Sequence, residues 1–235
     1  MMLAELSALL AACPPDSSRE DYVAAAIDEN ALGKATTSTR RLTIQRLSEL
    51  YALDREVPIF RALRRFWELD VDGQRLLALL VCLARDPLLR GSAPTVVDLR
   101  EGQNFDRDAM KEALSNTVGN RLNESTLDKV VRNAASSWTQ SGHLEGRTFK
   151  KRRLVRPARG VVAMALFLGY LQGIRGPGIL QTFWCRVLDT QPDELAQIAT
   201  AASMAGALRF RRGGDVVEVS FPSLVSRTEL ERAHE

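Results

Sequence analysis

Seven cationic side chains gather in one short segment of the chain. Residues 147–159, RTFKKRRLVRPAR, contain no acidic residue, whereas the whole chain of 235 residues carries a net charge of only +3. The cations are Arg147, Lys150, Lys151, Arg152, Arg153, Arg156 and Arg159. Such side chains attract polyanions because they neutralise phosphates and release the counterions bound there. The charge pattern therefore predicts polyanion binding at this segment rather than over the whole surface.

The preceding segment, residues 123–140, has the pattern of an amphipathic helix. Its apolar residues recur at the spacing of one helix face, Leu127, Val130, Val131, Ala134, Ala135 and Trp138. We expect this face, Trp138 included, to be buried. The opposite face then presents Ser125, Asp128, Lys129, Arg132, Asn133 and Ser136. Short polar groups and cations of this kind contact base edges and phosphates in a major groove, but a solvated helix surface has the same composition.

The elements around this helix favour the first interpretation. Helices are predicted at 95–100, 106–118 and 123–140, followed by two short strands, 143–149 and 152–156, around a basic tip. Helix, helix, helix, hairpin is the order of a winged helix-turn-helix, here centred on residues 105–156. In that arrangement the hairpin lies beside the groove that the third helix enters. The expected backbone contacts of the hairpin are Arg147, Lys150, Lys151, Arg152 and Arg153.

A second, weaker basic cluster lies nearer the amino terminus. It contains Lys34, Arg40, Arg41 and Arg46 near the hydroxyl-bearing residues 36–38. The sequence leaves phosphate contact and a plain solvated surface equally open. A nucleotide-binding loop at Gly33-Lys34-Ala35 is excluded, because position 28 is not glycine and position 35 lacks the hydroxyl that holds magnesium.

The sequence contains no pattern typical of a catalytic or metal site. The histidines are His143 and His234, and neither has cysteine or carboxylate partners at metal-ligand spacing. We expect His143 to be a partly exposed strand residue at the start of the hairpin. No nucleophile with its base and no pair of carboxylates can be named. The predictions are therefore no enzymatic activity, no cofactor, no metal and no small-molecule substrate.

Cysteine usage and hydropathy indicate a cytoplasmic protein. Cys13, Cys82 and Cys185 are odd in number, scattered and placed in apolar helical patterns, as expected of reduced core thiols. The most apolar runs, 76–84 and 161–171, are shorter than the roughly 20 residues of a membrane-spanning helix. We therefore expect no membrane association. We also expect no secretory signal, because the apolar segment from Met1 to Cys13 contains Glu5 and no basic residue.

The predicted fold is mainly α, with three parts. Residues 1–90 are expected to form an all-helical domain, with a capping box at Ser17 and Glu20 before its second helix. Residues 91–157 form the winged helix-turn-helix. Residues 158–235 form a smaller winged-helix-like unit, with helices at 158–173, 178–188 and 191–205 and strands at 208–212 and 215–221.

The amino-terminal half also resembles a known family. The run DENALGKATTSTRRLTIQRLSEL, residues 28–50, resembles the signature of the BrxA family, accessory proteins of BREX bacteriophage-exclusion systems. The elements that carry the likeness are Glu29, Asn30, Lys34, residues 36–39, Arg40, Arg41 and Arg46. The apolar helix 74–85 and the segment NESTLDKVVRNAASSWTQSGHLEG follow in the same order, so the likeness covers about residues 20–150 and fades after 160. It implies a helical, DNA-binding, non-catalytic component of a phage-defence system.

The preferred hypothesis is therefore a double-stranded DNA-binding accessory protein of a BREX-type system, with other proteins of the defence operon as further partners. A winged-helix transcriptional regulator uses the same module and stays open as an alternative. A protein-interaction scaffold without DNA contact is the third hypothesis. A scaffold would show no salt-dependent DNA affinity, which separates it from the other two.

Overall fold

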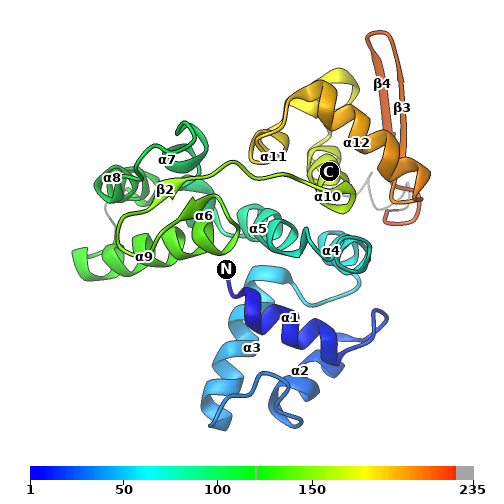
Figure 1. Cartoon of the computed structure of the whole chain (residues 1–235). Helices are drawn as coiled ribbons and strands as arrows, with labels where there is room; N and C mark the ends of the chain where they lie inside the picture. Colours follow the sequence, from blue (N-terminus) through cyan, green and yellow to red (C-terminus); the bar gives the residue numbers. More distant parts are fainter. Residues whose placement is uncertain (120, 226–235) are drawn as a thin grey trace.

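The chain is mainly helical, as predicted, and carries two small two-stranded antiparallel sheets (Figure 1). The computed structural model describes residues 1–119 and 121–225. The helices before the first sheet are α1 (Leu3–Ala12), α2 (Arg19–Ile27), α3 (Thr37–Tyr51), α4 (Pro58–Leu69), α5 (Gln74–Arg85), α6 (Pro87–Gly91), α7 (Pro94–Val97), α8 (Arg107–Val118) and α9 (Glu124–Gln140).

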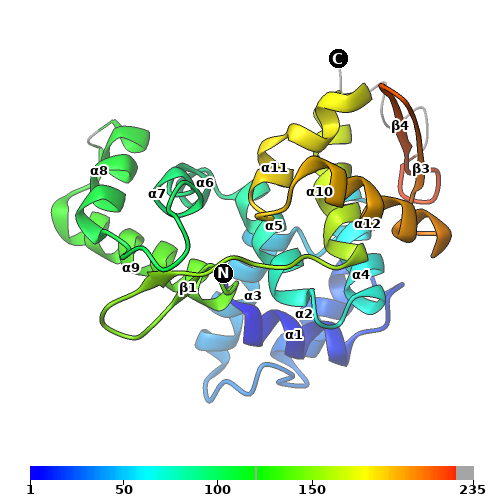
Figure 2. The same ribbon diagram turned by 45° about the horizontal axis from the view of Figure 1, so that its top comes forward.

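The second half of the chain continues from the first hairpin to the second. Its elements are β1 (Leu144–Glu145), β2 (Lys151–Arg152), α10 (Arg159–Leu171), the 3-10 helix η1 (Gly176–Gln181), α11 (Phe183–Arg186), α12 (Pro192–Met204), β3 (Arg209–Gly213) and β4 (Val216–Ser220). Helices α4 and α5 run through the middle of the molecule. The β1–β2 hairpin with α8 and α9 lies at one end, and the β3–β4 hairpin lies at the other (Figures 1 and 2).

Local capping explains where the helices of interest begin. The Asp106 side chain accepts hydrogen bonds from the first-turn amides of α8, and the Asn123 side chain accepts one from Thr126 N in α9. The capping box of α2 was predicted one residue too early. Ser18 and Asp21 form it, instead of Ser17 and Glu20, because Ser17 is buried before the helix starts.

Two apolar helices form the centre of the core. Every residue from Leu76 to Leu83 in α5 is buried, as is every residue from Gly160 to Tyr170 in α10. Helix α10 packs against α4, α5 and α12. The buried Asp70 carboxylate, at the end of α4, accepts a hydrogen bond from Val161 N and thereby caps α10 from another segment. The residues that follow the first hairpin therefore pack on the amino-terminal helices, while the predicted division at 90 and 157 stays a prediction.

Two predicted elements differ from the structure. The first hairpin has two-residue strands, much shorter than the predicted 143–149 and 152–156. Gly146, with a φ of +115°, turns the chain directly after β1, in a conformation that favours glycine. The helix predicted at 178–188 is divided into η1 and α11, because extended Thr182 interrupts it and caps α11.

None of the helices in the described ranges combines the length and apolar composition that a membrane crossing needs.

Trp138 of α9 is fully buried, as the helix pattern predicts. Its Nε1 donates to Ser92 Oγ at 2.8 Å, and its ring contacts the edge of His143 with ring centroids 5.0 Å apart. This side chain joins α9 to the loop between α6 and α7.

We expect Trp138→Ala to lower the free energy of unfolding by about 3–5 kcal/mol, because it removes a large buried ring and leaves a cavity. Trp138→Phe loses mainly the indole hydrogen bond and should cost about 1 kcal/mol. Urea unfolding measures both. Arg132→Ala, on the exposed face of the same helix, is the control and should change stability by less than about 0.5 kcal/mol. Equal stability of Trp138→Ala and the control would contradict the orientation of α9.

Candidate nucleic-acid interface

Helix α9 separates an apolar face from a polar one. The buried side includes Leu127, Val131, Ala134, Ala135 and Trp138, while the predicted core residue Val130 is half-buried. The predicted contacts Ser125, Lys129, Arg132 and Asn133 are all exposed. The structure therefore gives α9 a polar face that is free to meet a ligand.

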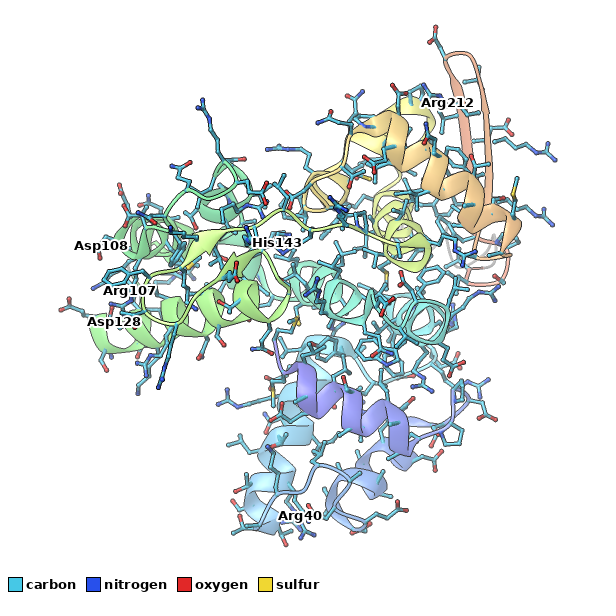
Figure 3. The ribbon with its side chains drawn as sticks, in the orientation of Figure 1. Arg40, Arg107, Asp108, Asp128, His143 and Arg212 are labelled. Atoms are coloured by element: carbon cyan, nitrogen blue, oxygen red, sulfur yellow. The ribbon has the colours of Figure 1, made fainter. Side chains whose placement is uncertain are left out.

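The acidic residues of this face are already engaged by cations from α8. Lys111 Nζ lies 3.1 Å from a Glu124 carboxylate oxygen and 3.2 Å from one of Asp128. Arg107 lies 3.5 Å from Asp128, and Figure 3 shows the two side by side. Lys129 and Arg132, by contrast, make no ion pair with any residue that the structure describes. The acidic charges of this face are therefore neutralised by α8, and the positive charges of Lys129 and Arg132 remain.

The β1–β2 hairpin is supported from its other side by the segment that precedes α8. Arg152 N donates to Gln103 O, and Phe105 N donates to Lys150 O, each at 2.9 Å. These bonds make residues 103–105 a third, strand-like neighbour of β2, paired antiparallel at Asn104 and Lys151. The hairpin is fixed to the α8–α9 unit by backbone bonds that no local sequence pattern reveals.

The cations of the hairpin have different environments. Arg147 and Lys151 are exposed. Lys150 is half-buried, and its Nζ donates to Thr139 Oγ1 at 2.8 Å and to Gly146 O at 3.1 Å, which ties the hairpin tip to α9. Arg153 is exposed and paired with Glu145 across the hairpin at 2.7 Å.

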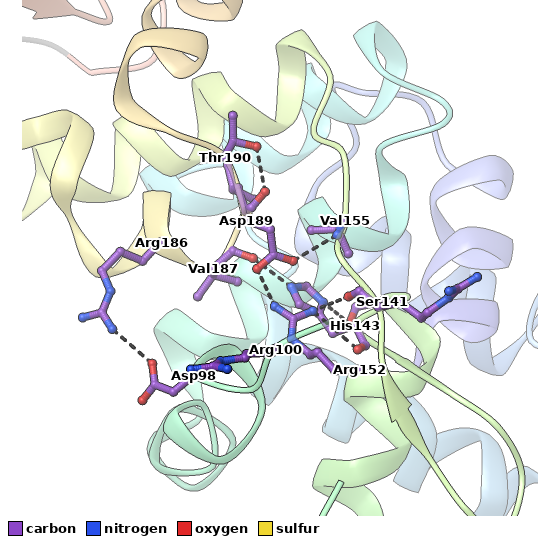
Figure 4. A network of polar contacts seen from close by, with 12 residues as sticks. Asp98, Arg100, Ser141, His143, Arg152, Val155, Arg186, Val187, Asp189 and Thr190 are labelled. Atoms are coloured by element: carbon purple, nitrogen blue, oxygen red, sulfur yellow. Dashed lines mark hydrogen bonds and ion pairs between the residues drawn. The ribbon is translucent and has the colours of Figure 1, made fainter. Parts of the chain in front are cut away.

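Arg152 corrects the sequence prediction. Its side chain is fully buried and forms an ion pair with Asp189, from the loop before α12 (Figure 4). Arg152 was predicted as a backbone contact because it lies in the basic run. It points inward because side chains alternate along a strand, and its neighbours Lys151 and Arg153 point outward.

His143 also differs from its prediction as a partly exposed residue. It is fully buried, its Nε2 lies 2.8 Å from Val187 O, and its Nδ1 lies 2.8 Å from Ser141 Oγ. Burial lowers the pKa of His143 to about 4, so the ring is neutral at pH 7. Burial also raises the pKa of the Asp189 carboxyl, partly offset by its hydrogen bonds from Val155 N and Arg152. Both residues belong to one buried polar network behind the hairpin (Figure 4).

A groove of about 540 Å³ separates α9 from the hairpin tip. Arg132 and Ser136 of α9 line one side of it, and Arg147, Phe149 and Lys150 line the other. A more open hollow of about 830 Å³ continues along the amino-terminal half of α9 past Ser125 and Lys129, and Arg132 borders both. The tertiary structure therefore brings together most of the predicted contacts of the helix and hairpin. Asn133, Lys151 and Arg153 are exposed but line neither hollow.

Phe149 is a residue that sequence reasoning missed. It was predicted inside a strand, as aromatic residues often are, yet its side chain is 85% exposed at the hairpin tip. Its place at the mouth of the groove makes it part of the candidate interface.

The amino-terminal basic cluster lies elsewhere. Lys34 pairs with Glu5 at 2.9 Å, and Arg40 donates to the backbone oxygens of Ile27 and Lys34. Arg41 is exposed on α3. Figure 3 shows Arg40 well apart from Arg107 and Asp128. Lys34 and Arg40 hold the loop before α3 in place, and the structure does not bring this cluster to the α9 surface.

Within residues 1–119 and 121–225, no group of three or more histidine, cysteine or acidic side chains is arranged to hold a metal ion. The three cysteines are buried and unpaired, and burial raises the pKa of Cys82 and of Cys185 to about 11. These thiols lack the low pKa that reactive cysteines require. His234 lies outside the described residues.

Comparisons of the chain with protein-family models, with curated proteins and with solved structures give no match. The resemblance to the BrxA family stays a prediction from sequence.

We expect the stability of the protein to depend on pH through His143. The unfolded ring takes up a proton near pH 6.5, whereas the folded ring does so only near pH 4. As the pH falls through this window, the unfolded state binds more protons, so the free energy of unfolding should decrease, by up to about 3 kcal/mol. The raised pKa of Asp189 acts in the opposite sense at the acid end. Urea unfolding at several pH values should give a smaller pH dependence for His143→Gln; an identical slope would contradict the assignment.

We expect Arg152→Ala to lower the free energy of unfolding by about 3–5 kcal/mol, because it leaves the Asp189 carboxylate buried without its partner. Arg153→Ala is the matched control. It removes a neighbouring arginine whose ion pair is exposed, and should cost less than about 1 kcal/mol. Thermal and urea unfolding measure both variants. Similar losses in the two would show that Arg152 is not held as described.

Proposed function

We propose that this protein binds double-stranded DNA through a winged helix-turn-helix unit formed by residues 94–153, without enzymatic activity of its own. Helix α9 enters the major groove, and the β1–β2 hairpin lies on the adjacent backbone. The observation that carries the proposal is the groove between Arg132 of α9 and Arg147 of the hairpin tip. Two separate basic elements border one hollow, so that one can lie in the major groove of a duplex while the other contacts the adjacent backbone.

The order and pairing of the elements support this proposal. Helix α7 is followed by the strand-like residues 103–105, then α8, α9 and the hairpin, with β2 paired on both sides. A winged helix has the same order, with a strand before its second helix that pairs with the last strand of the wing. The proposal assigns α9 as the recognition helix.

The chemistry of the exposed groups fits a phosphate backbone and base edges. Lys129, Arg147 and Lys151 are exposed and carry no ion pair within the described parts of the chain, so their charges are available to phosphates. Arg132, further along α9, reaches for base edges or phosphates. The Phe149 ring offers apolar contact to sugars or to the minor-groove edge beside the wing.

The cellular role that we propose is that of an accessory protein in a BREX-type phage-defence system. This part rests on the sequence resemblance at residues 28–50 and 123–146 alone. Other proteins of that system would be its partners. Two alternatives make different predictions: a scaffold has no salt-dependent DNA affinity, and a transcriptional regulator has a strong sequence preference.

The proposal is tested with a triple variant, Lys129→Ala/Arg147→Ala/Lys151→Ala. We expect weaker binding to every duplex sequence and a salt dependence, log K against log salt, that is shallower by about 2–3, because each lost phosphate contact contributes about 0.9. Fluorescence anisotropy with a 20-bp duplex at several salt concentrations measures both quantities.

The matched control removes three exposed arginines that belong to neither basic cluster, Arg19→Ala/Arg55→Ala/Arg85→Ala. It should keep the wild-type slope. An equal loss in both variants would show that bulk charge, rather than this surface, drives binding. An unchanged affinity and slope in the first variant would rule out α9 and the hairpin tip as the interface.

A further inference from the structure

The β3–β4 hairpin carries a second set of cations, at the end of the molecule opposite to α9 (Figures 1 and 2). Arg209 and Arg211 are exposed on one face of β3, while Phe210 between them is buried on the other face. Across the hairpin Arg209 faces Ser220, and Arg211 faces Glu218. Strand alternation therefore points two arginines to the same side.

A third arginine approaches this face from the loop after α10. The Arg175 guanidinium lies over the Tyr170 ring, 3.7 Å from its centroid. Its Nη1 donates to Tyr170 O at 2.7 Å and to Ile174 O at 2.9 Å. These contacts hold the planar group in one orientation and leave its Nη2 and Nε available to a ligand.

The three arginines border one pocket of about 430 Å³, together with Ile179, Val217 and Ser220. Glu218 is the acidic residue among the lining side chains. Arg209 and Arg211 make no ion pair with the described residues, whereas Arg212 on the opposite face of β3 pairs with Asp193 at 2.8 Å. Three cations beside one carboxylate give this pocket an excess of positive charge, which favours an anionic ligand.

We propose that this pocket is a second nucleic-acid site, which binds the phosphodiester backbone independently of α9. The guanidinium forks of Arg175, Arg209 and Arg211 are suited to phosphate oxygens, which they hold through paired hydrogen bonds. Ser220, which faces Arg209 across the hairpin, supplies a hydroxyl beside the guanidinium groups. The pocket is large enough for a phosphate with its sugar.

The helix beside this hairpin shows why the contact is confined to the backbone. The exposed residues of α12 include Asp193, Glu194, Gln197 and Thr200, with no cation among them. An acidic helix is repelled from a major groove. Helix α12 and the β3–β4 hairpin therefore repeat the helix-plus-hairpin order of residues 94–153, but only the hairpin contacts the nucleic acid. Since it contacts the backbone and not the bases, this site binds without sequence preference.

The two sites lie at opposite ends of the molecule (Figures 1 and 2). A protein that has both sites can therefore hold two duplex segments. The holding of two duplexes rests on the proposed function of α9. The proposal that the β3–β4 hairpin binds phosphate does not depend on α9.

The test is the double variant Arg209→Ala/Arg211→Ala, with Arg186→Ala/Arg212→Ala as the matched control. The control removes two exposed arginines from the same part of the chain, each already paired with an aspartate. Anisotropy titrations use full-length protein and a random 20-bp duplex at several salt concentrations. We expect the double variant to bind roughly tenfold more weakly at low salt, with a slope shallower by about 2, and the control to stay within about twofold of wild type. Thermal melting verifies folding, and Arg209→Gln/Arg211→Gln replaces the alanine variant if that variant unfolds.

The same titration in the Lys129→Ala/Arg147→Ala/Lys151→Ala background separates the two proposals. Loss of the remaining affinity on adding Arg209→Ala/Arg211→Ala supports the hairpin site. Equal affinity and slope for the double variant and its control overturn it, whatever the α9 variant does. If the double variant weakens binding and the α9 variant does not, the result supports the hairpin site and contradicts the proposed α9 interface.

Discussion

The buried ion pair between Arg152 and Asp189 connects the proposed DNA-binding unit to the rest of the chain. Both side chains are almost completely shielded from water, at 0% and 5% exposure. The same aspartate accepts a hydrogen bond from Val155 N at 3.0 Å and adopts a φ of +55°. Next to it, His143 reaches Val187 O. Since a buried charge without its partner is costly, neither Arg152 nor Asp189 can leave without disturbing the hairpin or the loop before α12.

This constraint decides what remains available at the surface. With Arg152 directed inward, β2 must present Lys151 outward, and the backbone bonds to residues 103–105 then fix the strand beside α8. Lys150 ties the tip back to Thr139 of α9. The position of the hairpin tip relative to α9 is thus set by buried and half-buried contacts, and only the outermost side chains are left for a ligand. Pre-organised elements lose less entropy on binding.

The unpaired positive charge is concentrated at the two proposed sites, although the net charge of the chain is only +3. Around α9, cations from α8 engage the acids of the polar face, so that the unpaired positive charge is concentrated on α9 and the hairpin tip. Around β3, strand alternation places Arg209 and Arg211 on one face, and Arg175, stacked on Tyr170, adds a third positive charge beside them. Local concentration of charge, rather than net charge, produces a potential strong enough to attract a polyanion. Both sites combine arginine with short hydroxyl-bearing side chains, the usual groups at phosphates.

The sequence by itself determined the features that depend on neighbouring residues. The periodicity of α9 placed Trp138 in the core and Lys129 and Arg132 outside, and Asp106 and Asn123 marked helix starts, because helix faces and caps are set within a few residues. Long-range contacts decided the rest. Arg152 and Arg153 are equivalent in a basic run, yet only Arg152 meets Asp189, 37 residues away. His143 is buried by Val187, 44 residues away. The hairpin ends early because Gly146 turns the chain and residues 103–105 pair with β2. The pocket at Arg175 exists only because η1 and the β3–β4 hairpin meet in space. No local pattern encodes such partners, since the buried network forms only when distant segments pack together and exclude water.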